Sequence, residues 1–232
     1  MSKADRTAAE TRVAQRYFGS FADDYHKAFE GSGANPLHHL INRLFRRKTF
    51  VLRTALVEQA FRDYGVAGKT VLDLGCGSGE VSLAAARLGA RVIGLDIVPA
   101  MVNIAAAEAA AAGLSERVEY RVANILEESI PRADMTLMVG VIEYYSDLAS
   151  LLRRVCAATG DRLIIVDTHG PWWRRSLRYA LARLKSFYIF YRDPDEVAAL
   201  AAREGFEEAS RVAGHSYMFF EFRRKRTSGA SG

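Results

Sequence analysis

Residues 71–80 read Val-Leu-Asp-Leu-Gly-Cys-Gly-Ser-Gly-Glu, and this stretch decides the fold. An apolar run ends beside an acidic residue, a glycine-rich turn follows, and a helical pattern begins at Glu80. Glycines let the backbone turn tightly and let a ligand approach the main chain. The stretch therefore predicts a strand, a ligand-binding turn and a helix, in that order.

Strand-like and helix-like segments alternate on both sides of this stretch. We expect strands at 70–74, 91–95, 117–123, 135–139 and 162–167, and helices at 80–88, 99–112 and 147–158 between them. Such alternation is typical of an α/β fold with a doubly wound, mostly parallel sheet. A further helix at 193–203 precedes two strands at 206–212 and 217–222, which we expect to form an antiparallel pair at the sheet edge. The prediction is a seven-stranded, Rossmann-like sheet.

The glycine pattern limits the kind of ligand. A dinucleotide fingerprint needs a third glycine three positions after Gly77, and that position is Glu80. A carboxylate there would repel a pyrophosphate over the helix N-terminus. The Lys-Ser/Thr ending of a P-loop is also missing. These features favour a nucleoside-like ligand that is not rich in phosphate.

Three later segments extend the ligand site. Asp96 ends the second strand, twenty-one residues after Gly75, where an acid accepts both hydroxyls of a ribose. Asn124 follows the third strand, where a polar side chain can read an adenine edge. The fourth strand leads through Gly140 to Glu143, in a loop that should face the substrate.

These four segments, in this order, resemble the class I S-adenosylmethionine-dependent methyltransferases over residues 70–167. The resemblance implies S-adenosyl-L-methionine as cofactor, with Asp73 at its methionine end and Asp96 at its ribose. It implies that Asn124 contacts adenine, where the family commonly has Asp. The full set of residues that it implies for cofactor binding is Tyr25, Asp73, Gly75, Gly77, Asp96, Ile97, Met101, Asn124, Ile125, Gly140 and Val141.

Three further features are similar to the small-molecule O-methyltransferases. They are FADDYH at 21–26, GVIEYYSDLASLL at 140–152, and a basic aromatic insert after the fifth strand. Residues 9–30 are too aromatic for a free tail, and in the family such a segment covers the cofactor. The residues expected on the acceptor side are Tyr17, Tyr144, Tyr145, Trp172, Arg174 and Arg175. The tyrosines could equally pack against the cofactor, and the tryptophan could merely pack a lid.

His169 and Glu143 are the catalytic candidates. Each follows a strand at its carboxyl end, and these ends face the ligand crevice in open α/β sheets. Either side chain could take a proton from an acceptor hydroxyl. Cys76 is interpreted as a small filler of the turn rather than a reactive thiol. With only two cysteines among 232 residues, a disulfide framework and a four-cysteine zinc site are both excluded, and no metal is expected.

The charge distribution suggests an anionic partner. Net charge is +5, but fifteen of the 32 basic residues lie in three patches that contain none of the 27 acids. The patches span 36–53, 168–192 and 223–226. They suit an acidic acceptor, peripheral contact with an anionic membrane, or RNA, although solvated helix faces would explain them equally well. The N-terminus is polar and no apolar run approaches the roughly 20 residues of a membrane span, so a cytoplasmic protein is expected.

The sequence thus predicts one methyltransferase domain over 1–232. Its parts are a helical lid (1–65), a cofactor-binding core (66–167), a substrate-side insert (168–192), a C-terminal helix and strand pair (193–224) and a disordered tail (225–232). The expected reaction is methyl transfer to a small molecule, at oxygen, with a hydrophobic or anionic acceptor. An RNA-modifying methyltransferase or a nucleic-acid binder is the alternative. The sequence does not identify the acceptor or the oligomeric state.

Overall fold

The computed structural model describes residues 47–170 and 188–226, with ten isolated positions outside these ranges (12, 13, 15, 16, 19, 176, 179, 180, 182 and 183). The elements within the two ranges are α3 (Arg47–Tyr64), β1 (Thr70–Leu74), α4 (Glu80–Arg87), β2 (Arg91–Asp96), α5 (Pro99–Ala111), β3 (Val118–Val122), β4 (Ala133–Val139), η2 (Ile142–Tyr144), α6 (Leu148–Ala158), β5 (Thr159–Thr168), α8 (Pro194–Arg203), β6 (Phe206–Ala213) and β7 (Tyr217–Arg224).

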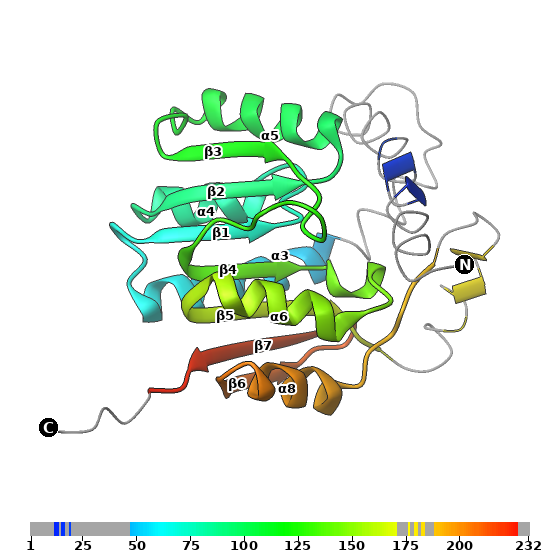
Figure 1. Cartoon of the computed structure of the whole chain (residues 1–232). Coiled ribbons are helices and arrows are strands. Elements are labelled where there is room, and N and C mark those ends of the chain that lie inside the picture. Colours follow the sequence, from blue (N-terminus) through cyan, green and yellow to red (C-terminus); the bar gives the residue numbers. More distant parts are fainter. Residues whose placement is uncertain are drawn as a thin grey trace, which may run out of the picture.

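Seven strands form one sheet in the order β3-β2-β1-β4-β5-β7-β6 (Figure 1). The first five in this order pair in parallel, and the chain reverses its winding direction between β1 and β4. The predicted fold class, a doubly wound and mostly parallel seven-stranded sheet, is confirmed. Ligands bind in such sheets at the carboxyl ends of the strands beside this reversal point.

Local sequence signals start and stop the helices. Pro99 lies in the first turn of α5, where its fixed φ angle suits a helix and its missing N–H is not needed. The Asp147 carboxylate caps α6 by accepting a hydrogen bond from the Ser150 backbone N–H at 3.1 Å. Asp193 caps α8 in the same way through Asp195. The helices consequently begin within one residue of their expected positions.

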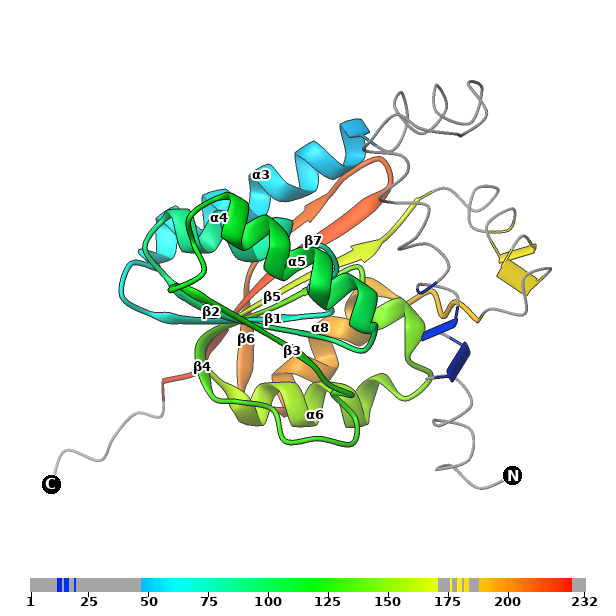
Figure 2. The ribbon, with the colours of Figure 1, turned by 90° about the horizontal axis from the view of Figure 1, so that it is seen from above.

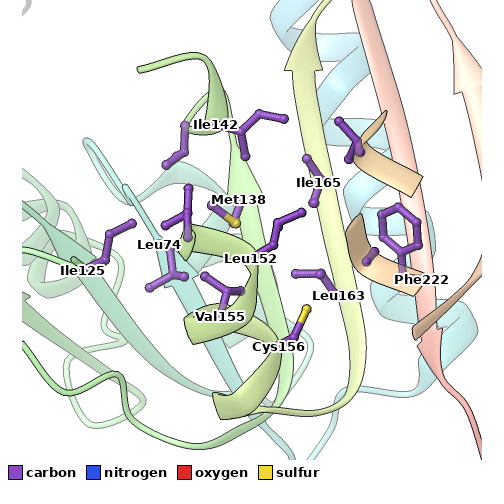
Figure 3. Packing of buried hydrophobic residues seen from close by; sticks show 14 of the residues in the cluster. Leu74, Ile125, Met138, Ile142, Leu152, Val155, Cys156, Leu163, Ile165 and Phe222 are labelled. Carbon is purple, nitrogen blue, oxygen red and sulfur yellow. The ribbon is translucent and has the colours of Figure 1, made fainter. Parts of the chain in front are cut away.

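Helices cover both faces of the sheet, α3, α4 and α5 on one and α6 and α8 on the other (Figure 2). Figure 3 shows the hydrophobic cluster beneath α6, to which Val155 of α6, Ile165 of β5 and Phe222 of β7 all belong. A second cluster lies on the opposite face and includes Phe61 of α3 and Ile164 of β5. Both faces of the central strands are therefore buried, as parallel strands require.

Helix α3 falls within residues 1–65, the expected lid. Its Val57 and Phe61 are fully buried against the sheet, and Ala60 is almost so. α3 also packs beside α4 on that face (Figure 2). These side chains pack into the core on this face, so residues 47–64 form part of the sheet's covering layer.

The last two strands form the expected antiparallel edge. β7 lies between β5 and β6 and pairs with both in antiparallel orientation. A salt bridge of 2.7 Å between Arg162 of β5 and Glu221 of β7 links the first pair. β6 forms the outer edge and exposes most of its side chains.

The carboxyl ends of β1 to β5 lie along one edge of the sheet, which we call the carboxyl edge (Figure 1). In the described part of the chain, no helix combines the length and hydropathy that crossing a bilayer would require.

Candidate cofactor and acceptor site

The glycine loop after β1 is held against the end of β2. The backbone N–H groups of Gly75 and Cys76 donate to the Leu95 carbonyl oxygen at 2.7 and 3.1 Å. Gly75 has φ +71°, and a Cβ at this residue would lie 2.5 Å from the Val141 side chain. At Gly77, with φ +54°, a Cβ would meet no atom of the described residues within 4 Å. Packing against Val141 therefore explains why residue 75 is a glycine, whereas the space in front of Gly77 is open for a ligand.

Asp96 lies beside that open space. One of its carboxylate oxygens accepts from the Gly77 N–H and the other from the Val98 N–H, each at 2.9 Å. Burial raises the pKa of Asp96, and these backbone hydrogen bonds oppose the rise by favouring the charged form. Ile97 and Met101 follow in a small apolar cluster with Val98. A carboxylate and an apolar surface thus stand side by side at the end of β2.

Asp73 lies in β1, just before the glycine loop. Its side chain is buried and accepts a hydrogen bond from the Ser82 hydroxyl of α4 at 2.7 Å. Burial raises the pKa of Asp73 to about 6, although the Ser82 hydrogen bond works in the opposite direction. Its neighbour Cys76 is buried too, and burial raises the pKa of that thiol well above its ordinary range. A neutral, enclosed thiol fits the interpretation of Cys76 as a filler.

Asn124 and Ile125 follow β3. The Asn124 side-chain oxygen accepts from the Leu126 N–H at 3.0 Å, which closes a local turn. Ile125 is buried in the cluster beneath α6, and its carbonyl oxygen accepts from the Arg154 guanidinium at 3.0 Å. The oxygen of Asn124 keeps a second lone pair, and its amide nitrogen is a donor. An adenine contact by Asn124 stays a prediction.

The end of β4 brings several predicted residues together. Gly140 has φ +70° and donates to the Val166 carbonyl oxygen at 2.7 Å. A Cβ at Gly140 would lie 3.7 Å from the Arg53 guanidinium of α3. Val141 is buried against Gly75, and Glu143 is buried in η2. This end of β4 therefore adjoins both the glycine loop and a cationic side chain of α3.

The two tyrosines after β4 occupy different surroundings. Tyr144 packs with Val13, Ile189 and Tyr191 in an apolar cluster that also includes Ala182. Burial raises the pKa of Tyr145, and the Asp96 carboxylate is near enough to raise it further. Tyr144 is thus placed toward the insert, and Tyr145 toward the end of β2.

His169 follows β5 at the same edge of the sheet. Its side chain is half-buried, and its backbone N–H donates to the Ser216 carbonyl oxygen at 3.3 Å. His169 and Glu143 thus follow neighbouring parallel strands, β5 and β4. Among the residues that the structure describes, no group of three His, Cys, Asp or Glu side chains could hold a metal ion.

Five predicted residues, namely Tyr17, Tyr25, Trp172, Arg174 and Arg175, lie outside the described residues. Described neighbours nevertheless link their segments to the carboxyl edge. The Gln15 side-chain amide donates to the Ile97 carbonyl oxygen at 3.2 Å. Val13 contacts the cluster around Tyr144. Positions of the N-terminal segment therefore reach both the end of β2 and the insert.

Three residues that were not predicted from the sequence also shape this edge. Ser82 bonds Asp73, and Tyr120 of β3 reaches the glycine loop with its hydroxyl. Arg192 donates to the carbonyl oxygens of Tyr145 and Ser146, and thereby fastens the end of the insert to the loop after η2. No local motif marks these residues, because each acts across elements that are far apart in the sequence.

A hollow of about 590 Å³ lies at the opposite edge of the sheet. Its polar side chains make structural bonds. The Asp134 carboxylate accepts from the Thr70 N–H at 2.8 Å, and Arg224 donates to the carbonyl oxygens of Cys156, Thr159 and Gly160. Neither the glycine loop nor any predicted site residue that the structure describes lines this hollow.

The sheet order, the glycine loop and the acid at the end of β2 define a class I methyltransferase fold. Residues 71–160 match the family model described as "Methyltransferase domain". This match covers less than half of the chain, and over these residues the chain is similar to methyltransferase domains.

Known proteins similar to this chain include ubiquinone biosynthesis O-methyltransferases. The protein of Methylobacterium sp. (strain 4-46) is 43% identical over 97 residues, which are 40% of this chain and 37% of that protein. The protein of Bradyrhizobium diazoefficiens is 37% identical over 128 residues, which are 53% of this chain and 48% of that protein. The chain spans less than half the length of either relative.

Among solved structures, magnesium protoporphyrin IX methyltransferase from Synechocystis PCC 6803, with bound SAH, is similar in fold. Its TM-score is 0.75 at 18% identity, over 93% of this chain and 100% of that one. At this identity the likeness concerns the fold.

Proposed function

We propose that this protein is an S-adenosylmethionine-dependent methyltransferase that acts on a small molecule at oxygen, and that the acceptor is hydrophobic, anionic or both. One observation carries the proposal most directly. The Asp96 carboxylate is fixed at the end of β2 by two backbone hydrogen bonds, beside a glycine whose side-chain space is open. A ribose diol needs an acceptor of this kind next to an unobstructed main chain.

The residues around that space fit the cofactor. Asp96 binds the ribose, and Ile97 and Met101 border the adenine, for which their apolar cluster is suited. Asn124 and Ile125 border the adenine from the end of β3. Asp73 and the glycine loop after it border the methionine end of the cofactor. Gly140 and Val141 present backbone beside the cofactor sulfur. Tyr25 belongs to the covering N-terminal segment.

When bound, S-adenosylmethionine supplies a methyl group on a positively charged sulfur. The chain's own part is to hold the acceptor oxygen in line with the sulfur–carbon bond and to exclude other geometries. Glu143 and His169 follow the two strands next to each other at this edge, so one of them takes up the acceptor's proton.

Three observations support a small acceptor that is methylated at oxygen. The two curated relatives are named as O-methyltransferases of ubiquinone biosynthesis, and the solved neighbour is named for a porphyrin. The apolar cluster of Tyr144, Ile189 and Ala182 offers a hydrophobic surface beside η2. Arg53 brings a positive charge to Gly140. None of these favours RNA as the acceptor.

Calorimetry with S-adenosylmethionine and with NAD tests the cofactor assignment. We expect S-adenosylmethionine to bind and NAD to bind much more weakly, and the reverse order would remove the assignment. Mass spectrometry of ligands retained on the purified protein is an independent check. A transfer assay with labelled methyl groups then compares lipophilic hydroxyl and carboxyl compounds with RNA, and label in RNA alone would replace the proposal by the alternative.

The acceptor side has its own test. Tyr17, Tyr144, Tyr145, Trp172, Arg174 and Arg175 are the proposed contacts. In the double variant Arg174→Ala with Arg175→Ala, we expect the acceptor KM to rise and the S-adenosylmethionine Kd to stay near wild type. A raised S-adenosylmethionine Kd with an unchanged acceptor KM would mean that the insert belongs to the cofactor site.

A cytoplasmic location, with peripheral contact of the insert on an anionic membrane, belongs to the same proposal. Each basic side chain near such a surface is worth about 1 kcal/mol. Sedimentation with vesicles that contain anionic lipid, compared with neutral vesicles, measures this contact.

A further inference from the structure

The ring of Tyr120, in β3, lies against Gly94 of the neighbouring strand β2. Tyr120 pairs in register with Gly94. A Cβ at Gly94 would lie 2.4 and 2.6 Å from two carbon atoms of the Tyr120 ring and 3.1 Å from the Cys76 sulfur. Contacts this short do not occur between carbon atoms, so the ring occupies the space that any side chain at position 94 would need. Gly94 has no positive φ, and the obstacle there is purely steric.

The far end of the same ring reaches the start of α4. A Cβ at Gly79 would lie 2.3 Å from the Tyr120 hydroxyl oxygen. That hydroxyl donates to the Gly79 carbonyl oxygen at 3.4 Å. The same carbonyl accepts the Leu83 N–H at 2.8 Å, in the first turn of α4. One tyrosine therefore contacts β2 at Gly94 and the last glycine of the loop at Gly79.

The phenol also adjoins a buried polar pair. Its hydroxyl is within hydrogen-bonding reach of Ser82, and Ser82 donates to the Asp73 carboxylate at 2.7 Å. Burial raises the pKa of Tyr120, and the nearby Asp73 carboxylate raises it further, so the hydroxyl remains a donor. The groups that face it are Ser82 of α4, Asp73 of β1 and Cys76 of the loop. Buried networks of this kind fix geometry because every broken bond leaves a polar group without water.

We propose that Tyr120 is a positioning residue for the cofactor loop. Its ring contacts this loop, residues 75–79, on the side away from the ligand space, and so sets the path of the loop backbone. This rests on the proposed function, because the loop is the one that would hold S-adenosylmethionine. Gly77 presents the open side of the loop, and Gly79, two residues later, is fixed by Tyr120. Tyr120 alone thus requires a glycine at position 94. At position 79 it adds to a φ of +82° that itself favours glycine, and Gly77 is left for the ligand.

A compensation experiment tests the steric half of the proposal without any cofactor. We expect Gly94→Ala to lower the Tm of the unliganded protein strongly, because its methyl group collides with the ring. In a Tyr120→Val background the same Gly94→Ala change should cost much less, because the ring is gone. Glu119→Ala, at an exposed position of the same strand, is the matched control for Tyr120→Val and should leave the penalty of Gly94→Ala intact. Additive effects of the two changes on the Tm would overturn the contact.

Tyr120→Phe tests the positioning half, since it keeps the ring and removes the hydroxyl. We expect the S-adenosylmethionine Kd and KM to rise by about threefold to tenfold, the range for one neutral hydrogen bond, with kcat at saturating cofactor unchanged. An unchanged Kd in a variant with a lowered Tm would leave Tyr120 a purely structural residue and overturn the proposal. If the wild type binds no S-adenosylmethionine, the proposed function fails instead, and the compensation experiment still reports on the contact between Tyr120 and Gly94.

Discussion

At the scale of single residues, Asp96 carries the largest share of the proposed cofactor binding. Asp96→Ala would remove the two charge-assisted hydrogen bonds that we propose to the ribose, at about 1.5–3 kcal/mol each at most. It also releases the Gly77 and Val98 N–H groups that hold the loop. We expect calorimetry to give a Kd raised by at least about tenfold.

Asp134→Ala is a matched control for Asp96→Ala, because Asp134 also accepts from a backbone N–H but lies at the opposite edge of the sheet. It should alter stability and leave the cofactor Kd near wild type. Equal cofactor affinity in the wild type and Asp96→Ala would remove the ribose assignment.

Asp73 makes stability depend on pH in an unusual direction. Burial raises its pKa in the folded state from 3.8 to about 6, so between these values the folded protein holds a proton that the unfolded chain has released. The free energy of unfolding therefore falls as pH rises from about 4 to 6, by up to about 3 kcal/mol from this group. Asp73→Asn removes this dependence.

Denaturant unfolding at several pH values measures this effect. The stability of Asp73→Asn relative to wild type should increase between pH 4 and pH 6.5 and then level off. A difference that does not change with pH would mean that the Asp73 carboxyl titrates alike in both states.

At the scale of elements, glycine and proline made much of the fold predictable. Pro99 and Gly205 stand where α5 begins and where α8 has ended, and β1 begins and ends as expected. Pairing between strands decided two features that the sequence did not indicate, the start of β5 and the edge position of β3. β5 begins at Thr159 rather than Arg162, because Thr159 pairs with Ala133 beyond an irregularity in register. β3 proved to be an edge strand, with Val122 47% exposed.

The candidate site divides in the same way. Asp96 and Gly77 could be predicted, because motif spacing fixes a residue at the end of a strand and a glycine in the turn. Tyr120 could not, because its role depends on being paired with Gly94, and ten tyrosines in the chain offer no local signal to select it. Helix α3 falls in the segment expected as a lid, because the sequence does not indicate that Val57 and Phe61 contact the sheet.

The N-terminal segment is the element whose function is most open to test. Deleting residues 1–30 removes the Gln15 bond to Ile97 and the Val13 contact but leaves α3 in place. We expect a folded protein with a Tm near wild type and a clearly weaker cofactor Kd. Gln15→Ala, which removes only the one hydrogen bond, should weaken binding less. Normal binding and turnover by the truncated protein would mean that the segment is no lid.

At the scale of the whole molecule, α3 tests how the covering layer contributes to stability. Phe61 is fully buried, and Phe61→Ala should lower the free energy of unfolding by about 3–5 kcal/mol. Leu52, on the same helix, is 56% exposed, and Leu52→Ala should stay within about 0.5 kcal/mol of wild type. Denaturant unfolding compares the two, and a similar loss in both would contradict the assignment of α3 to the core.

The place of β7 has a consequence for how the chain is made. β7 is the final strand of the sheet in sequence, yet it is inserted between β5 and β6, and β6 has no other partner in the described sheet. A nascent chain that has left the ribosome only as far as residue 216 therefore presents an unpaired β5 edge and an unanchored β6. Such edges recruit strands from other chains. Synthesis of residues 217–224 is the step that closes the sheet, and pausing before it would favour aggregation or chaperone capture.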